Sequence, residues 1–169
     1  MYTILESLGG GVALFDFNGD GLLDIFVTGG GTFGGPDGKQ IIGNPSRLYQ
    51  NLGGWRFRDV TAQVGLDQPL FYSHGCAVGD FDNDGWPDLL VTGWGAMVLY
   101  HNEPDGAGGR RFVNVTETAG LRQPQWATSA AWADLDGDGF AWFENARLAV
   151  PSDSAIAWAI WPPRALSHP

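Results

Sequence analysis

Two aspartate-rich loops constrain this chain more than any other part of its sequence. Residues 16–24 read DFNGDGLLD and residues 80–88 read DFDNDGWPD, so both place oxygen-bearing side chains at positions 1, 3, 5 and 9. Carboxylates crowded in this way repel one another and retain protons unless a cation neutralises them. Oxygens at positions 1, 3 and 5 can converge on one hard cation, and glycine at position 6 permits the tight turn. Ca²⁺ suits many oxygen ligands in a flexible loop better than Mg²⁺, which demands a strict octahedron.

A third loop, at residues 134–139, begins in the same way with DLDGDG but does not complete the pattern. Trp142 occupies position 9, where the first two loops carry Asp24 and Asp88. We therefore expect two complete calcium sites, and a third site that binds a cation weakly or not at all.

Two other interpretations of the loops are weaker. Asp, Asn and Gly favour turns in any protein, so a single loop could be an ordinary polar hairpin turn. Two full copies and a partial third make that interpretation less favourable. An EF-hand needs a bidentate Glu at position 12 and a helix on either side. Position 12 is Val27, Val91 or Asn145 in the three copies, which argues against an EF-hand.

Short apolar segments flank each complete loop. Residues 11–15 and 25–28 surround the first loop, and residues 76–79 and 89–93 surround the second. Short β-rich runs bounded by glycine are typical of buried strands rather than helices. The loops are therefore predicted to be the turns of β-hairpins, whose register a bound ion would hold.

A second pattern repeats out of phase with the loops. Residues 47–51 (RLYQN) precede 55–61 (WRFRDVT), and residues 98–102 (VLYHN) precede 111–116 (RFVNVT), each pair separated by a glycine-rich turn. The acidic loops begin 64 and 54 residues apart. About four strands in a period of roughly 40 to 60 residues indicate a β-propeller blade.

The order of these motifs, GGGVALFDFNGDGLLD (9–24), RLYQN (47–51) and FRDVT (57–61), resembles the FG-GAP/VCBS repeat family. More narrowly, the sequence is similar to the cartilage-acidic-protein-like group, also called ASPIC/UnbV, over residues 8–139. The resemblance implies calcium-binding propellers related to the head of integrin α-subunits. It also implies secreted, periplasmic or cell-surface proteins that act in cell adhesion or as platforms for protein–protein interaction.

The resemblance also assigns the cation ligands residue by residue. The side-chain ligands that it implies are Asp16, Asn18, Asp20 and Asp24 in the first loop and Asp80, Asp82, Asp84 and Asp88 in the second. The implied backbone ligands are the carbonyls of Leu22 and Trp86. The candidate ligands of the incomplete third loop are Asp134, Asp136 and Asp138.

We expect an all-β chain of about three four-stranded antiparallel blades, fewer than the four to eight blades of a closed propeller. The propeller repeats are expected within residues 1–139, over 8–66, 67–121 and a partial 122–139. Such an arc is an incomplete propeller or a fragment, and other protein chains would cover its open edges. Residues 140–169 follow no repeat and are either a divergent capping segment or the product of a reading-frame error.

The acidity of the chain is concentrated in the loops. The formal net charge is −10, and ten of the 19 acidic residues lie in the three loops. Without a basic patch to meet phosphates, nucleic acid is not an expected partner. No segment approaches the roughly 20 apolar residues of a membrane span, and residues 1–7 do not read as a signal peptide. We still expect an extracytoplasmic protein, because weak calcium sites suit extracellular fluid better than cytosol.

The sequence contains no persuasive catalytic constellation, so we do not expect an enzyme. Ser73 and His74 are adjacent residues next to a predicted strand and would point to opposite faces. The spacing of His101 and His168 does not suggest a metal triad, and Cys76 is expected in the core of an apolar strand.

Two alternatives to a non-catalytic interaction scaffold stay open. Trp55, Trp86 and Trp94 lie in or near turns, where their rings could stack on sugars as in a carbohydrate-binding propeller. The same rings could fill gaps between blades, which is the interpretation that we favour. The chain could also be an accessory repeat region of a larger secreted enzyme.

Overall fold

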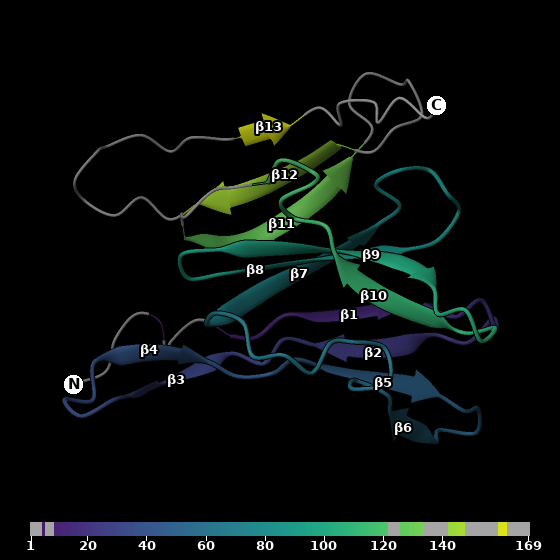
Figure 1. Ribbon diagram of the computed structural model, residues 1–169, viewed down its shortest axis with the longest axis horizontal. Coiled ribbons are helices and arrows are strands. Elements are labelled where there is room, and N and C mark those ends of the chain that lie inside the picture. Colours follow the sequence, from purple (N-terminus) through teal and green to yellow (C-terminus); the bar gives the residue numbers. More distant parts are fainter. Residues whose placement is uncertain (1–4, 6–8, 122–125, 134–141, 148–158, 162–169) are drawn as a thin grey trace.

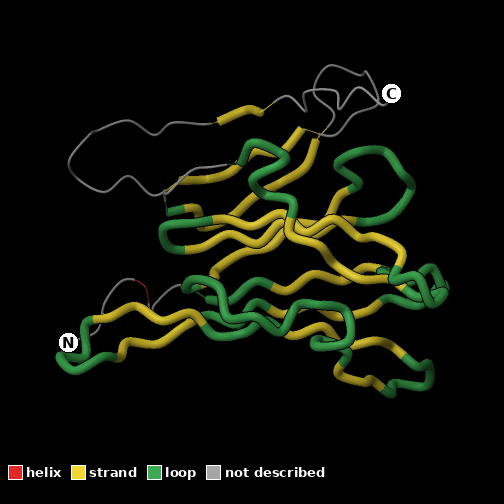
Figure 2. Tube along the Cα trace, in the orientation of Figure 1, coloured by secondary structure: helices red, strands yellow, loops and turns green. Residues whose placement is uncertain are grey.

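The computed structural model of the chain describes residue 5 and residues 9–121, 126–133, 142–147 and 159–161. The elements of these residues are thirteen β-strands joined by loops and turns (Figure 1, Figure 2). All hydrogen-bonded neighbours among these strands are antiparallel. The predicted all-β class is confirmed. Within the described part of the chain, no helix is long and apolar enough to cross a membrane.

Two four-stranded sheets form the centre of the molecule. The first sheet has the strand order β1-β2-β5-β6, and the second has the order β10-β9-β8-β7. Their strands are β1 (Val12–Phe15), β2 (Asp24–Val27), β5 (Arg47–Asn51), β6 (Phe57–Asp59), β7 (Ser73–Gly79), β8 (Asp88–Gly93), β9 (Met97–Pro104) and β10 (Arg110–Asn114). Each of these sheets is a meander of four strands, the architecture of a propeller blade.

A third sheet is formed by β11 (Ala127–Ala133), β12 (Trp142–Arg147) and β13 (Ala159–Trp161), in that order. Figure 1 shows the three sheets layered one above another, with β11 next to the second sheet. Strands β12 and β13 lie within 140–169, where the sequence shows no repeat.

The sequence does not predict one hairpin of the structure. Strands β3 (Gly31–Gly34) and β4 (Gln40–Gly43) pair with each other and lie between β2 and β5 in the chain. The second sheet has only the turn 94–96 at the corresponding place, between β8 and β9. The insertion therefore accounts for the longer spacing between the first two acidic loops. Its glycine-rich sequence gives little strand signal, since glycine is depleted in strands.

The core has two layers, one between the first and second sheets and one between the second sheet and β11. One face of the first sheet presents Phe15, Phe26 and Leu48 to the second sheet. The second sheet meets them with Leu89, Val91, Val98, Tyr100 and Phe112. The opposite face of the second sheet packs Leu90, Met97 and Leu99 against Ala127 and Trp132 of β11. The second sheet is therefore covered on both faces, by the first sheet on one side and by β11 on the other.

Candidate metal centre

The two complete acidic loops connect equivalent strands of the first two sheets. The first loop joins β1 to β2, where Phe15 pairs with Asp24. The second joins β7 to β8, where Gly79 pairs with Asp88. Position 9 of each loop is thus the first residue of a strand, and the predicted hairpins are present.

The aspartate at position 1 organises each loop through backbone hydrogen bonds. In the first loop, Asp16 Oδ1 accepts from the N–H of Asp20 at 3.1 Å, and its Oδ2 accepts from the N–H of Gly21 at 2.7 Å. In the second loop, Asp80 Oδ1 accepts from the N–H of Asp84 at 3.1 Å, and its Oδ2 accepts from the N–H of Gly85 at 2.8 Å. The two loops therefore share one folded form, and each turns around its first carboxylate.

Left-handed backbone conformations close these turns. Gly19 and Gly21 have φ angles of 75° and 82° in the first loop, and Asn83 and Gly85 have φ angles of 60° and 88° in the second. Glycine adopts such angles without steric cost, and asparagine tolerates them better than most residues. The glycine at position 6 is therefore required by the turn itself.

The aspartates at position 9 are fully buried and tie each loop to the neighbouring strands. Asp24 accepts hydrogen bonds from the N–H groups of Phe17, at 3.1 Å, and Asn51, at 2.7 Å. Asp88 accepts the equivalent bonds from Phe81, at 3.0 Å, and Asn102, at 2.8 Å. Burial raises the pKa of Asp24, and it raises the pKa of Asp88 to about 7 although the N–H donors lower it.

The second loop gathers its acidic side chains most tightly. One carboxylate oxygen from each of Asp80, Asp82 and Asp84 lies within 4.8 Å of the other two. At that separation two negative charges repel by on the order of 3 kcal/mol at an effective dielectric constant of 20. Burial raises the pKa of Asp82, and the carboxylates of Asp84 and Asp80 also raise it, although the nearby His101 lowers it. A cation would remove this repulsion, and a set of oxygen donors fits a hard divalent cation.

The first loop brings its predicted ligands together in a similar way. The side-chain amide of Asn18 donates to Asp20 Oδ2 at 3.0 Å, and the N–H of Leu22 donates to Asp20 Oδ1 at 2.9 Å. The ligand roles of these side chains, and of the carbonyls of Leu22 and Trp86, remain predictions. Asp134, Asp136 and Asp138 of the third loop lie outside the described residues.

His101, for which the sequence predicts no role as a ligand, lies at the second loop. His101 of β9 places Nε2 3.3 Å from Asp82 Oδ2 and 3.4 Å from Asp84 Oδ2. Its ring also packs edge-on against Phe81, with the ring centroids 5.4 Å apart. Sequence spacing alone gives no signal for this contact, because the pairing of β8 with β9 brings residue 101 back to the loop.

The two loops are also joined to each other. The side-chain amide of Asn102 donates to the carbonyl of Phe17 in the first loop and to that of Pro87 in the second. The Trp86 ring lies against Gly19, and the guanidinium of Arg110 stacks on that ring with its Cζ 3.8 Å from the centroid. The predicted sites are therefore parts of one packed end of the molecule.

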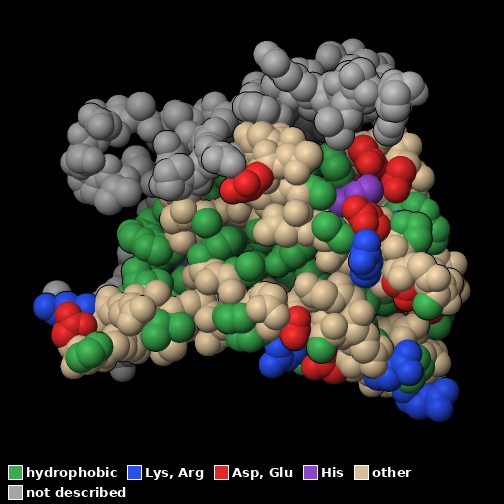
Figure 3. Space-filling view, in the orientation of Figure 1, with side chains coloured by type: hydrophobic (Ala, Val, Ile, Leu, Met, Phe, Trp, Pro, Cys, Tyr) green, Lys and Arg blue, Asp and Glu red, His purple; other side chains and the backbone are tan. Residues whose placement is uncertain are grey.

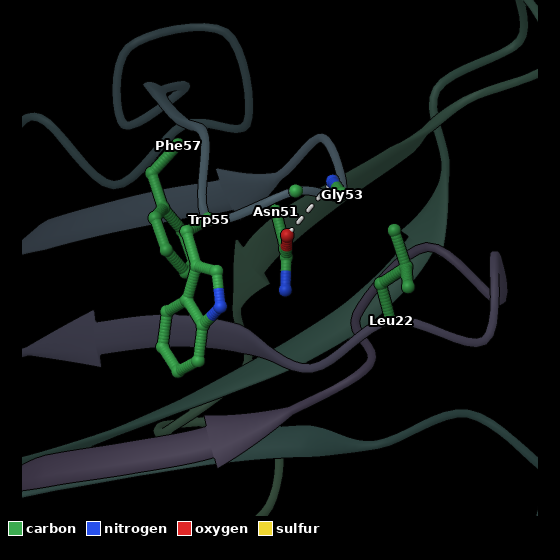
Figure 4. Close-up of a pocket in the computed structure, with 6 residues that line it drawn as sticks. Leu22, Asn51, Gly53, Trp55 and Phe57 are labelled. Carbon is green, nitrogen blue, oxygen red and sulfur yellow. Dashed lines mark hydrogen bonds between the residues drawn. The ribbon is translucent and has the colours of Figure 1, made fainter.

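The three candidate sugar-stacking tryptophans have different surroundings. Trp86 is packed between the loops as just described, and Trp94 packs edge-on against Trp126 with the ring centroids 4.9 Å apart. Trp55 is 94% exposed, in the turn between β5 and β6. It lines a pocket of about 250 Å³ together with Leu22 and Phe57 (Figure 4). Trp55 is therefore the most exposed of the three rings.

Four-stranded meanders whose first hairpin turns on an acidic loop define a class of β-propeller repeat. The FG-GAP-like repeat matches residues 16–91 and 80–141, which together make up most of the sequence. The chain belongs to the FG-GAP-like repeat family, as its sequence resemblance predicts.

Similar proteins include cartilage acidic protein 1 and integrin α chains. Cartilage acidic protein 1 of Mus musculus is 28% identical over 94 residues, which are 56% of this chain and 14% of that protein. Integrin alpha-6 of Gallus gallus is 32% identical over 108 residues, 61% of this chain and 10% of that protein. Integrin alpha-7 of Homo sapiens is 25% identical over 174 aligned positions, 98% of this chain and 14% of that protein. The chain therefore spans a small part of the length of each relative.

Proposed function

We propose that this chain is a calcium-binding propeller segment that serves, outside the cytoplasm, as a non-catalytic scaffold for protein–protein interaction. The observation that carries the proposal is the convergence of Asp80, Asp82 and Asp84 in a loop whose fold recurs around Asp16. A cation held there would neutralise the carboxylates and stabilise the turn between two strands. The similarity to cartilage acidic protein 1 and integrin α chains supports an extracellular role.

The outer face of the first sheet supports the interaction role. Strand pairing gives that face an apolar part, next to the exposed ion pair of Arg47 and Asp59. The apolar residues are Val12, Leu14, Ile25, Val27 and Tyr49. Val12 and Leu14, in the edge strand β1, are each 61% exposed, and an exposed apolar patch on a sheet can serve as an interaction surface.

The packing of the second sheet supports one kind of partner for this face. Its equivalent face carries Cys76, Val78, Leu89, Val91 and Tyr100, and it is covered by the Phe26 and Leu48 side of the first sheet. The partner that fits the outer face of the first sheet is therefore another blade-like sheet with an aromatic and aliphatic surface.

Thermal unfolding in Ca²⁺ and in EDTA tests the calcium proposal. A site present at about 100 times its Kd adds about 2.7 kcal/mol, which raises the Tm of a chain of this size by about 5–10 °C. Asp20→Asn should abolish the increase in Tm that the first site contributes, and Asp84→Asn should abolish the increase that the second site contributes. In EDTA the same variants should be as stable as the wild type or more so, because each removes a repelling charge. An equal Tm of the wild type in Ca²⁺ and EDTA would contradict the proposal.

Asp67→Asn is the matched control for these variants. Asp67 lies outside the loops, and its side chain accepts a 3.3 Å bond from the side-chain amide of the neighbouring Gln68. Its removal changes the net charge by the same amount and should leave the calcium-dependent rise in Tm intact.

Carbohydrate binding is the second candidate function, and the exposed Trp55 ring favours it. An indole ring with a free face beside an apolar pocket can stack on a sugar ring. A glycan array with the wild type, Trp55→Ala and Trp94→Ala tests this candidate. Selective binding that is lost in Trp55→Ala and kept in Trp94→Ala would support it, whereas binding unaffected by Trp55→Ala would exclude this ring.

A further inference from the structure

His101 distinguishes the second loop from the first. In the first two sheets, Ile25 pairs with Tyr49 and Leu89 pairs with Tyr100. The residue after each tyrosine is therefore equivalent, and it is Gln50 in the first sheet and His101 in the second. Of the two acidic loops that the structure describes, the second alone therefore has an imidazole beside it.

The imidazole is held in place against the loop. Its Nε2 lies 3.3 Å from Asp82 Oδ2 and 3.4 Å from Asp84 Oδ2, and the side chain is 19% exposed. On the other side of the ring, Nδ1 lies 3.6 Å from Glu103 Oε1. A cation on Nε2 requires the tautomer with its proton on Nδ1, and the Glu103 carboxylate on that side would stabilise this proton once a cation is bound. Figure 3 shows acidic side chains gathered around a histidine on one face of the molecule.

The donor atoms have the spacing of a metal site that mixes nitrogen and oxygen. One donor atom from each of Asp82, Asp88 and His101 lies within 4.8 Å of the other two. Zinc bonds to histidine nitrogen and carboxylate oxygen are about 2.0–2.2 Å long, so two donors of a tetrahedral zinc ion lie about 3.4 Å apart. The distances from His101 to the two loop aspartates match that separation.

We propose that the second loop and His101 form a nitrogen–oxygen site that accepts a borderline divalent cation, Zn²⁺ above all. This inference deepens the cation-binding function proposed above and rests on it. Imidazole is a good ligand for zinc and its transition-metal neighbours, whereas Ca²⁺ selects oxygen ligands. The first loop, with Gln50 in the equivalent place, is an oxygen-only site for hard cations.

The test is a reciprocal exchange between the two loops. Zn²⁺ and Ca²⁺ are titrated separately into calcium-free wild type, His101→Gln and Gln50→His by isothermal calorimetry. In His101→Gln the zinc affinity of the second loop should fall about tenfold or more, the size of effect seen when a metal-site residue is lost. Its calcium affinity should change much less. Gln50→His should increase the zinc affinity of the first loop.

Two further measurements separate a ligand from an ion-pair partner. Co²⁺ bound by the wild type should show a visible absorption spectrum that changes in His101→Gln, because a nitrogen ligand is lost. His168→Gln removes a histidine from another part of the sequence and should leave both the zinc affinity and the spectrum unchanged.

Each outcome decides between the two proposals. Zinc affinity that is equal in wild type and His101→Gln, with calcium bound normally, would overturn the role of His101 and leave the calcium function standing. Binding of neither Zn²⁺ nor Ca²⁺ by the wild type would overturn both. A parallel loss of zinc and calcium affinity in His101→Gln would make His101 a positioning residue and overturn the nitrogen–oxygen site. Gln50→His is interpretable even if His101→Gln is unstable.

Discussion

The side-chain amide of Asn102 donates a 2.9 Å hydrogen bond to the carbonyl oxygen of Phe17, 85 residues earlier in the chain. The same side chain donates to the carbonyl of Pro87, and its backbone N–H donates to Asp88. One fully buried residue of β9 therefore contacts both acidic loops. Because these bonds cross between two sheets, they fix the position of one proposed cation site relative to the other.

Asn102→Ala should destabilise the protein by about 2 kcal/mol. The substitution removes the donor from the buried bond to Phe17 and from the partly buried bond to Pro87. A buried unsatisfied group costs about 1–3 kcal/mol, and the cost is smaller where water can enter. It also removes the acceptor of a 3.0 Å bond from Arg110 Nε. Chemical denaturation of both proteins in saturating Ca²⁺ measures the difference in the free energy of unfolding.

Asn51→Ala is the control for that substitution. Asn51 is the equivalent residue of the first sheet. Its side-chain amide makes an exposed bond to the carbonyl of Leu23 in the adjoining loop, and its Oδ1 accepts from the N–H of Gly53 in the next turn. Its loss should cost clearly less, because water can replace an exposed bond. Equal losses in the two variants would contradict a special role for the contact between sheets.

The repeated strands and hairpin turns could be predicted from sequence, because each acidic loop is bounded by short apolar runs and glycine. The contacts of Asn102 and His101 could not. Both residues lie in β9, in a strand segment whose sequence carries no ligand motif. Their partners lie in loops that come close to β9 only through strand pairing and sheet packing. Local pattern thus specifies the blade, whereas the environment of the site depends on how one blade packs against the next. The β3–β4 hairpin could not be predicted for a different reason, because its glycine-rich strands contain few residues with a high propensity for β-structure.

Gly19→Ala should cost more stability than Gly21→Ala. Both glycines have positive φ angles, where an alanine costs about 1–2 kcal/mol. Only at Gly19 would an added Cβ meet another residue, the Trp86 ring at 3.0 Å, whereas nothing lies within 4 Å at Gly21.

A double-mutant cycle with Trp86→Ala isolates that contact between the loops. The extra loss in Gly19→Ala should disappear when the ring is absent, and the loss in Gly21→Ala should not change. A Gly19→Ala effect that is independent of Trp86 would mean that backbone strain alone accounts for it.

Truncation of a side chain should cost much more free energy of unfolding on the inner face of the first sheet than on its outer face. Phe26 is fully buried against the second sheet, so Phe26→Ala should lose about 3–5 kcal/mol. Leu14 lies on the outer face and is 61% exposed, so Leu14→Ala should change the free energy of unfolding by less than about 1 kcal/mol. Urea denaturation at two protein concentrations checks both values. A large, concentration-dependent loss in Leu14→Ala would show that this face is buried by a second copy of the chain.

His74 should make stability depend on pH between about 7 and 5. Its ring is 4% exposed and stacks on Tyr72, with the ring centroids 5.0 Å apart. Neither ring nitrogen has a hydrogen-bond partner among the described residues, and burial lowers the pKa of the imidazole. In the unfolded chain the ring titrates near its ordinary pKa of about 6.5. Below that pH the unfolded state binds the proton more readily than the folded state, so stability falls as the pH falls.

His74→Phe removes this titration while keeping an aromatic ring against Tyr72 and Trp126. The variant should therefore gain stability relative to the wild type as the pH is lowered from 7 to 5, because only the wild type loses the contribution of a neutral imidazole. Taking the difference between the two proteins at each pH cancels the titration of the acidic loops, which both contain. A difference that stays constant over this range would mean that His74 is protonated as readily in the folded protein as in the unfolded chain, and that its burial carries no electrostatic penalty.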